Sequence, residues 1–448
     1  MDPPEHAAEL IVSGQYLMPT WRQEDAVING AIAIRGDTIL DIGSRPDILA
    51  RHPHADELFE PHGLIMPGLV NTHTHAPMAY FRGFADDLPL MTWLQDHMFP
   101  VEAQLDSEIV HDATLLSIIE MIKSGTTSFC DMYLFAKDVA RAAHRSGIRC
   151  WIGEMLSDFP SLSYGELHNG LRYAEEMFME YQNHPLVSII VAPHSIYTCS
   201  PALLQQCHRL AEKYQSLYVI HLSENDTEVE NCIKQYGTTP VRHLDNLGVL
   251  TSRTLAAHCV KLDDEEISVL ADRAIHVSHC IESNMKLASG IAPVPKLLKQ
   301  GVLVSIGTDG SASNNNVDMF SEMSAVARTH KAIIFDPTAM NAETTLHAAT
   351  LGGAAALNAE NRIGTLVPGK RADLIVLDLN QPHLIPLYNL PSQLVYAARG
   401  GDVIHSVING RIIMEKRVLK TLDESAVMSR MQEIGKRIGS LREAKTKA

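Results

Sequence analysis

The sequence lacks the marks of a disulfide-stabilised protein or a zinc-cluster protein. Its seven cysteines are odd in number, lie scattered between positions 130 and 280, and form no C-x-x-C motif. A disulfide framework usually has an even number of cysteines, and a structural zinc site usually has paired C-x-x-C motifs. We therefore expect reduced thiols in the core of a cytoplasmic protein.

Long apolar runs and an excess of basic residues are also missing. No apolar stretch reaches the roughly 18 residues of a membrane span. The start, MDPPEHAAEL, has no basic segment followed by an apolar core, so we expect no secretory signal. The net charge of −16 argues against nucleic acid or an anionic membrane as partner, because both attract basic surfaces.

What the chain does contain is a repeated alternation of strand-like and helix-like segments. The 448 residues are 46% hydrophobic, and most of the apolar, β-rich segments are separated by stretches with helix signals. Ser200 before Pro201 and Asp263 before Glu266 indicate helix starts, and Gly301 indicates a helix end. The strand-like segments are 64–70, 126–132, 148–155, 187–193, 217–223, 254–259, 275–280 and 302–309.

This alternation predicts an α/β fold with a parallel sheet covered by helices on both faces. Eight such units fit a (β/α)8 TIM-like barrel over residues 64–365. An open, doubly wound sheet has the same periodicity and is the alternative.

The two ends of the chain have a different pattern of short alternating strands and tight turns, at 9–62 and 366–420. Neither end is long enough for a comfortable core of its own. We expect one small β-sandwich built from residues 1–63 and 366–448, with a charged amphipathic helix in the last 25 residues.

Imidazole and carboxylate side chains recur where the predicted barrel strands end. In VNTHTH, His73 and His75 point the same way, because successive side chains of a strand alternate between faces. Barrel enzymes carry their chemistry at the carboxyl ends of the strands. The other strand-end residues are His194, His221 with Glu224 three residues later, His258, His279 and Asp309.

Each of these residues has an ordinary structural explanation. A single histidine could be a hydrogen-bonded rim residue, and Asp309 before Gly310 could be a turn residue. Several such histidines and an aspartate at the strand ends of one barrel are better explained by a metal site. Three histidines and one aspartate suit zinc, with a position left for a water molecule whose pKa zinc lowers to about 7.

The motifs PGLVNTHTH, HLSEN, AHC and GTDGSASNNNVDMFSEM occur in this order, followed by IGTLVPGKRADLIVLD. With them the chain resembles the amidohydrolase superfamily over essentially its whole length. Within it, the chain is similar to the 5′-methylthioadenosine/S-adenosylhomocysteine deaminases, relatives of the triazine chlorohydrolases. The resemblance implies one divalent metal, preferably zinc, with His73, His75, His221 and Asp309 as ligands. The lysine that bridges two metals in other members is missing from 148–155 and 187–194, which favours a single ion.

The resemblance also implies the residues that contact substrate. Glu224 and His258 would face the purine ring, Glu102 would bind the ribose hydroxyls, and His194 would hold the nucleoside. Ser313 would hydrogen-bond the purine. Without the resemblance, Glu102 would be interpreted as a solvated glutamate at a helix start.

The implied reaction is hydrolytic deamination of the 6-amino group of an adenine nucleoside. Asp309 would take a proton from the attacking water and return it to the leaving amine. Glu224 would donate a proton to N1, a role that burial favours by raising its pKa. His258 would orient the hydroxide or stabilise the tetrahedral adduct by a hydrogen bond.

Two features bear on the substrate. The aromatic and methionine-rich segment 80–99 could wall an apolar pocket for a methylthio group, or could simply pack in the core. Relatives that accept S-adenosylhomocysteine carry an arginine near the position of Glu154, and a carboxylate there would repel the carboxylate of that substrate. We therefore expect 5′-methylthioadenosine to be preferred, with adenosine and S-adenosylhomocysteine unranked.

The alternative function is a deaminase or chlorohydrolase of another heterocycle, such as guanine, a pterin or a triazine. Glu102 with His194 separates the two, because a free base has no ribose to bind. A barrel that has lost catalysis would be expected to lack ligands, and here the set is complete. The sequence leaves zinc, iron and manganese open, and it is compatible with a homo-oligomer.

Overall fold

Two parallel sheets form the centre of the molecule in the computed structural model, which describes residues 8–88 and 92–446. One sheet has the order β5-β6-β7-β8, with β9 beside β7, and the other has the order β10-β11-β12-β13. The strands are β5 (Leu69–Thr74), β6 (Thr126–Tyr133), β7 (Arg149–Leu156), β8 (Val187–Ile189), β9 (Ala192–Pro193), β10 (Tyr218–Leu222), β11 (Thr254–His258), β12 (His276–His279) and β13 (Leu303–Ile306).

Hydrogen bonds join the two parallel sheets at both of their outer edges. At one edge, the Val191 amide donates to Leu217 and the Val219 amide donates back to Val191, at 3.0 and 2.9 Å. At the other edge, the Asp309 amide donates to the His73 carbonyl at 2.9 Å. The carboxyl ends of β5, β10, β11 and β13 therefore face one common region.

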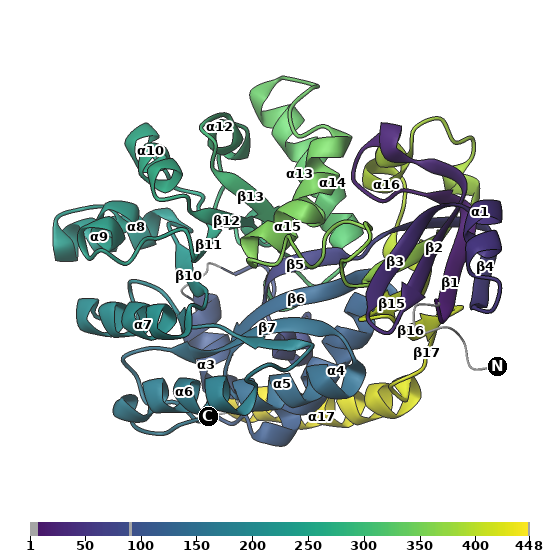
Figure 1. The fold of residues 1–448 in the computed structure, drawn as a ribbon. Coiled ribbons are helices and arrows are strands. Elements are labelled where there is room, and N and C mark those ends of the chain that lie inside the picture. Colours follow the sequence, from purple (N-terminus) through teal and green to yellow (C-terminus); the bar gives the residue numbers. More distant parts are fainter. Residues whose placement is uncertain (1–7, 89–91, 447–448) are drawn as a thin grey trace.

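Helices surround these strands on the outside (Figure 1). The predicted starts are confirmed, since the Ser200 side chain accepts from the Leu203 amide, and Asp263 and Glu266 form a capping box. The longer helices are α4 (Ser107–Lys123), α5 (Ala136–Ser146), α6 (Gly170–Glu180), α7 (Pro201–Tyr214), α8 (Asp226–Tyr236), α10 (Asp264–Asp272), α13 (Met319–Ile334), α14 (Ala342–Ala349) and α17 (Glu424–Thr446). The shorter ones are α1 (Arg45–Arg51), α3 (Phe99–Glu102), α9 (Pro240–Asn246), α11 (Ile281–Lys286), α12 (Val294–Lys299), α15 (Leu351–Ala356) and α16 (Leu390–Tyr396).

A third sheet combines strands from both ends of the chain, in the order β17-β16-β15-β14-β4-β1-β2-β3. Its centre is the antiparallel pairing of β4 with β14, which places Leu374 opposite Pro67. The strands are β1 (Leu10–Leu17), β2 (Val27–Arg35), β3 (Thr38–Ser44), β4 (Asp56–Pro67), β14 (Leu374–Asp378), β15 (Val403–Ile408), β16 (Arg411–Glu415) and β17 (Val418–Leu419).

The predicted strand 64–70 is divided between two sheets. Leu64 to Pro67 belong to β4 in the third sheet, and β5 begins at Leu69. The intervening Gly68 lies so close to β6 that a Cβ atom there would stand 2.1 Å from the Thr127 hydroxyl. Only glycine fits this position, where the chain passes from one sheet to the other.

Two further expectations concern the whole chain. All seven cysteines are free and buried, as predicted. Among the described residues, no helix has both the length and the hydropathy to cross a membrane.

Candidate active site

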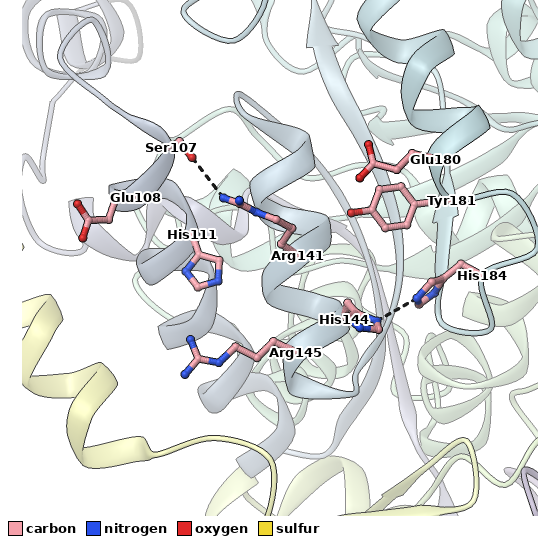
Figure 2. A pocket seen from close by; sticks show the side chains of 9 residues that line it. All are labelled: Ser107, Glu108, His111, Arg141, His144, Arg145, Glu180, Tyr181 and His184. Atoms are coloured by element: carbon pink, nitrogen blue, oxygen red, sulfur yellow. Dashed lines mark hydrogen bonds between the residues drawn. The ribbon is translucent and has the colours of Figure 1, made fainter.

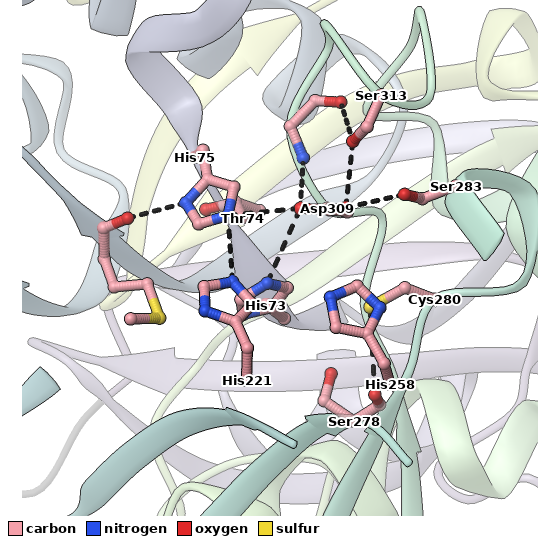
Figure 3. A network of polar contacts seen from close by, with 12 residues as sticks. His73, Thr74, His75, His221, His258, Ser278, Cys280, Ser283, Asp309 and Ser313 are labelled. Carbon is pink, nitrogen blue, oxygen red and sulfur yellow. Dashed lines mark hydrogen bonds and ion pairs between the residues drawn. The ribbon is translucent and has the colours of Figure 1, made fainter. Parts of the chain in front are cut away.

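The structure brings His73, His75, His221 and Asp309 together at the strand ends (Figure 3). The His73 and His75 rings on β5 lie 4.9 Å apart, and the His221 ring on β10 lies 4.9 Å from His73 and 5.2 Å from His75. Asp309 follows β13, and its Oδ1 lies 3.2 Å from His75 Nε2 and 3.5 Å from His73 Nε2.

Backbone carbonyls fix the tautomers of two of these histidines. His75 Nδ1 donates to the Met132 carbonyl at 2.6 Å, and His221 Nδ1 donates to the His194 carbonyl at 2.7 Å. Each neutral ring then carries a lone pair on Nε2, and these two Nε2 atoms lie 3.2 Å apart. Two lone pairs cannot share a hydrogen bond without a proton between them, so the arrangement calls for a cation.

The third histidine and the spacing of the donor atoms are also compatible with a bound metal ion. His73 Nε2 is buried and has no hydrogen-bond partner among the described residues. The donor atoms of His73, His75 and His221 all lie within 4.8 Å of one another. Nitrogen from three imidazoles and oxygen from one carboxylate is a donor set that zinc accepts, and the carbonyl bonds behind the rings orient the donors.

The electrostatics keep these donors in the protonation state that a metal needs. Burial lowers the pKa of His73 to about 4 and that of His221 well below its ordinary value. Burial would raise the pKa of Asp309, but the adjacent His73 and the other neighbouring imidazoles hold that pKa well below the ordinary value. The pKa shifts of these three groups therefore favour neutral imidazoles at His73 and His221 and a carboxylate at Asp309, the forms that bind a metal.

Glu224 lies just beyond β10 in a turn held by a second glutamate. The Glu228 carboxylate accepts from the amides of Ser223 and Glu224, at 3.0 and 2.7 Å. Ser289 donates to Glu224 Oε1 at 3.4 Å. Burial raises the pKa of Glu224, which favours a protonated carboxyl able to donate.

His258 ends β11 in a left-handed conformation, with φ +70°. Its ring is stacked against His221 with the centroids 5.5 Å apart. Asn284 Nδ2 lies 3.0 Å from His258 Nδ1, so the neutral ring accepts there and carries its proton on Nε2. His258 also lies within ligand distance of His73 and Asp309, but with Nδ1 accepting from Asn284 and the proton on Nε2 its ring has no free lone pair for a metal.

The two serines near Asp309 hold its second oxygen. Ser283 and Ser313 donate to Asp309 Oδ2 at 2.6 and 2.8 Å (Figure 3). Because Oδ2 is occupied, Oδ1 is the oxygen that faces His73 and His75. The hydroxyl hydrogen of Ser313 is thus committed to Asp309, and toward a substrate this serine can offer only lone pairs.

The residues expected to hold a nucleoside lie beside the cluster. The His194 ring is 4.9 Å from that of His221, and its Nδ1 lies 2.9 Å from the Thr198 hydroxyl. Burial lowers the pKa of His194 to about 3. Glu102 at the end of α3 accepts a hydrogen bond from Tyr133, whose ring is 6.0 Å from that of His75.

His279 and Glu154 do not join this cluster. His279 Nε2 lies 3.0 Å from Nε2 of His330 on α13. Glu154 Oε2 accepts from the Ala136 amide at the start of α5, at 2.9 Å. Burial raises the pKa of Glu154 to about 8, so the group is mainly neutral at pH 7 and the expected repulsion of a substrate carboxylate is absent.

For the segment 80–99, the sequence left open whether the aromatic and methionine side chains wall a pocket or pack in the core. Over most of its described part, they pack in the core. Tyr80, Phe81 and Met98 are buried in the main hydrophobic core, and Phe99 just beyond is half-exposed. Residues 89–91 lie outside the described part of the chain.

Sequence reasoning missed several residues that support the site, among them Asp131 at the end of β6. Its Oδ2 accepts from the Thr74 hydroxyl and the Ala76 amide, at 2.8 and 2.5 Å, and so holds the chain on both sides of His75. The signal was a carboxylate at a predicted strand end, in TTSFCDM.

A separate cavity of about 700 Å³ lies on the outer layer, between α4, α5 and the end of α6 (Figure 2). It is lined by Arg141 and Arg145 but also by Glu108 and Glu180. None of the residues predicted for the site lines this cavity, so it is unrelated to the cluster at the strand ends.

Comparison with known proteins identifies the class to which this fold and cluster belong. The amidohydrolase family matches residues 64–413. The chain belongs to the amidohydrolase family.

Its similarity to individual members is high over nearly the full length. The chain is 50% identical over 431 residues to a 5-methylthioadenosine/S-adenosylhomocysteine deaminase of Syntrophobacter fumaroxidans, covering 96% of this chain and 98% of that one. It is 44% identical to a 5'-deoxyadenosine deaminase of Methanothermobacter thermautotrophicus, covering 89% and 97%.

A crystal structure of an adenosine deaminase from Xanthomonas campestris with bound zinc superposes with a TM-score of 0.95. It is 38% identical to this chain and covers 98% of it and 100% of the other. With the family membership, this match confirms the predicted TIM-barrel-like α/β class.

Proposed function

We propose that this protein is a metal-dependent hydrolytic deaminase that converts the 6-amino group of an adenine nucleoside to the inosine analogue and ammonia. The observation that carries the proposal is the convergence of His73, His75, His221 and Asp309 with the buried carboxyl of Glu224. The relatives named as deaminases of 5-methylthioadenosine and 5'-deoxyadenosine support an adenine nucleoside as substrate. 5′-Methylthioadenosine is the preferred candidate.

His73, His75, His221 and Asp309 would hold one divalent ion, for which zinc suits the donor set. When bound, zinc makes water a strong nucleophile near neutral pH. The chain itself supplies the proton transfers. Asp309, fixed by two serines at Oδ2, takes a proton from the attacking water and later returns it to the departing amine.

Glu224 and His258 act on the purine. Burial raises the pKa of Glu224, which favours the protonated carboxyl that donates to N1 and makes C6 more electrophilic. His258, whose Nδ1 is occupied by Asn284, presents an N–H to the oxygen that becomes negatively charged at C6.

The nucleoside would be held by three further residues. Glu102 accepts from the ribose hydroxyls, His194 contacts the nucleoside, and Ser313 accepts from the purine. Support comes from the closeness of Glu102 and His194 to the His75–His221 side of the cluster.

The proposal extends to the architecture. We infer a closed barrel within the predicted range 64–365 and a sandwich from the two ends of the chain, predicted as 1–63 and 366–448. The boundary between them moves to Gly68, because Leu64 to Pro67 belong to β4. The hydrogen bonds at both edges of the parallel sheets and the β4–β14 pairing support this division. A cytoplasmic location and a small-molecule partner, rather than nucleic acid, belong to the same proposal.

An ultraviolet assay on zinc-loaded protein tests the function. 5′-Methylthioadenosine, S-adenosylhomocysteine, adenosine and guanine would be compared at equal concentration. We expect conversion of the adenine chromophore to hypoxanthine, fastest with 5′-methylthioadenosine. Inactivity on all three nucleosides, with metal bound and guanine converted, would replace the proposal by the free-heterocycle alternative.

A further inference from the structure

Glu102 is held by a chain of two tyrosines that the proposed mechanism does not use. Tyr133 donates its hydroxyl to Glu102 Oε1, and the Tyr80 hydroxyl lies 2.6 Å from the Tyr133 hydroxyl. We propose that Tyr133, braced by Tyr80, is a positioning residue that makes the site select nucleosides with intact ribose 2′ and 3′ hydroxyls. The inference rests on the proposed role of Glu102 at the ribose.

The direction of the hydrogen bonds follows from the carboxylate. Tyr133 donates to Glu102 Oε1, so the Tyr133 hydrogen points to Glu102. The Tyr133 oxygen then accepts, and the Tyr80 hydrogen fills that place. Both O–H groups are therefore aligned toward Glu102, and each strengthens the next.

The two tyrosines are rigidly placed. Tyr133 ends β6 and is 2% exposed, and Tyr80 lies in the short 3-10 helix Ala76–Phe81 that follows His75, with 7% exposed. The chain of hydroxyls thus runs from the turn behind a metal-ligand candidate to Glu102. These hydrogen bonds link the position of Glu102, at the end of α3, to the 3-10 helix that directly follows His75.

The arrangement leaves Glu102 with one occupied and one available oxygen. Oε1 accepts from Tyr133, and no hydrogen bond is recorded for Oε2 among the described residues. Burial raises the pKa of Glu102, while the bond from Tyr133 favours the ionised form. A carboxyl group with a single available oxygen at a fixed place is suited to accept from a diol.

Removing the Tyr133 hydroxyl while keeping the aromatic ring tests the positioning role of Tyr133. In Tyr133→Phe, the ring beside His75 stays, but the Glu102 carboxyl group loses the one hydrogen bond that it receives among the described residues. KM and kcat would be measured with 5′-methylthioadenosine and with its 2′-deoxy and 3′-deoxy analogues. We expect KM for the ribonucleoside to rise about tenfold, as for loss of a hydrogen bond to a charged group, with kcat within about threefold. KM for the deoxy analogues should change much less, and Tyr80→Phe should give a smaller effect in the same direction.

A double-mutant cycle separates positioning through Glu102 from a general structural role. Once Glu102→Ala has removed the carboxylate, adding Tyr133→Phe should cost nothing further in KM. Tyr218→Phe is the matched control, because the buried Tyr218 hydroxyl has no hydrogen-bond partner in the described part of the chain. It should behave as the wild type.

Two results would overturn the inference. One is an equal rise in KM for the ribonucleoside and both deoxy analogues in Tyr133→Phe. The other is a full additional effect of Tyr133→Phe in the Glu102→Ala background. Failure of the proposed function is distinguishable, because the wild-type enzyme would then convert none of these nucleosides, and the inference would fall with it.

Discussion

At the scale of single residues, the presence of histidines does not define the site by itself. The site depends on where the Nε2 lone pairs of those histidines point. The sequence predicted that His73 and His75 share a face, and their rings do lie side by side. It could not predict that the carbonyls of Met132 and His194 select the tautomers, because backbone groups leave no trace in residue identity. Those two bonds are what turn the Nε2 atoms toward a common point.

Asp309 should be indispensable. In Asp309→Asn the amide can neither accept the proton of water nor complete an anionic donor set, and its NH2 group would compete with the serine donors at Oδ2. We expect kcat to fall by roughly 1,000-fold or more, as for other residues that move protons in the reaction. Steady-state kinetics and metal content on the same preparation would be the measurement.

The control is Asp245→Asn, since Asp245 lies on the outer helix α9 and pairs with Arg273. It should keep wild-type kcat. Wild-type turnover by Asp309→Asn with its metal bound would remove Asp309 from the mechanism.

At the scale of elements, the order of strands and helices was predictable, and the exact breaks were not. The capping residues Ser200 and Asp263 marked helix starts correctly because each side chain accepts from an amide three residues later in the same helix. The predicted strand 187–193 is divided into β8 and β9, and 64–70 is divided at Gly68. Both breaks depend on contacts with other strands, which local periodicity does not report.

Glu154 illustrates the same limit. The sequence placed it near the substrate, but its carboxyl caps the start of α5 by accepting from Ala136. Its partner is 18 residues away along the chain, on the turn that follows β6. Only the packing of β6 beside β7 brings them together.

Glu154→Gln should change how stability depends on pH. Burial raises the pKa of Glu154 from 4.5 to about 8, so the folded state keeps a proton that the unfolded chain loses above about pH 4.5. Stability from this group is fully present below that pH and is lost as pH rises to about 8. The glutamine variant, which stays neutral, should match the wild type at pH 5 and melt at a higher temperature at pH 9.

Thermal unfolding from pH 5 to pH 9 would measure this difference. Glu212→Gln, on the exposed side of α7, is the control for a change of the same chemistry at the surface. If the difference in melting temperature between wild type and Glu154→Gln were the same from pH 5 to pH 9, the raised pKa of Glu154 would be contradicted.

At the scale of the whole molecule, a buried ion pair joins the C-terminal part of the chain to strand β7 of the parallel sheet. Arg149 on β7 donates to both oxygens of Asp373, at 2.6 and 3.1 Å, and Asp373 also accepts from the Asn409 amide at 2.7 Å. The pairing joins residues 224 positions apart. The sequence suggested that both ends form one unit, but it contained no sign of this contact.

Arg149→Leu should therefore destabilise the protein strongly. It leaves the Asp373 carboxylate buried without its cation, a change that typically costs about 3–5 kcal/mol. Chemical denaturation would measure it. Arg273→Leu breaks a pair with Asp245 in which the Arg273 side chain is 52% exposed, and should cost far less than Arg149→Leu because solvent screens the pair. Equal losses for the two variants would show that the buried pair has no special role.

The central claim concerns the whole assembled site, and the most direct test identifies its products. Zinc-loaded protein would be incubated with 5′-methylthioadenosine in water enriched in oxygen-18, and the products analysed by mass spectrometry together with released ammonia. The account predicts the inosine analogue with one labelled oxygen, the methylthioribose intact, and one ammonia per product. Release of free adenine, or unchanged nucleoside with metal bound, would contradict it.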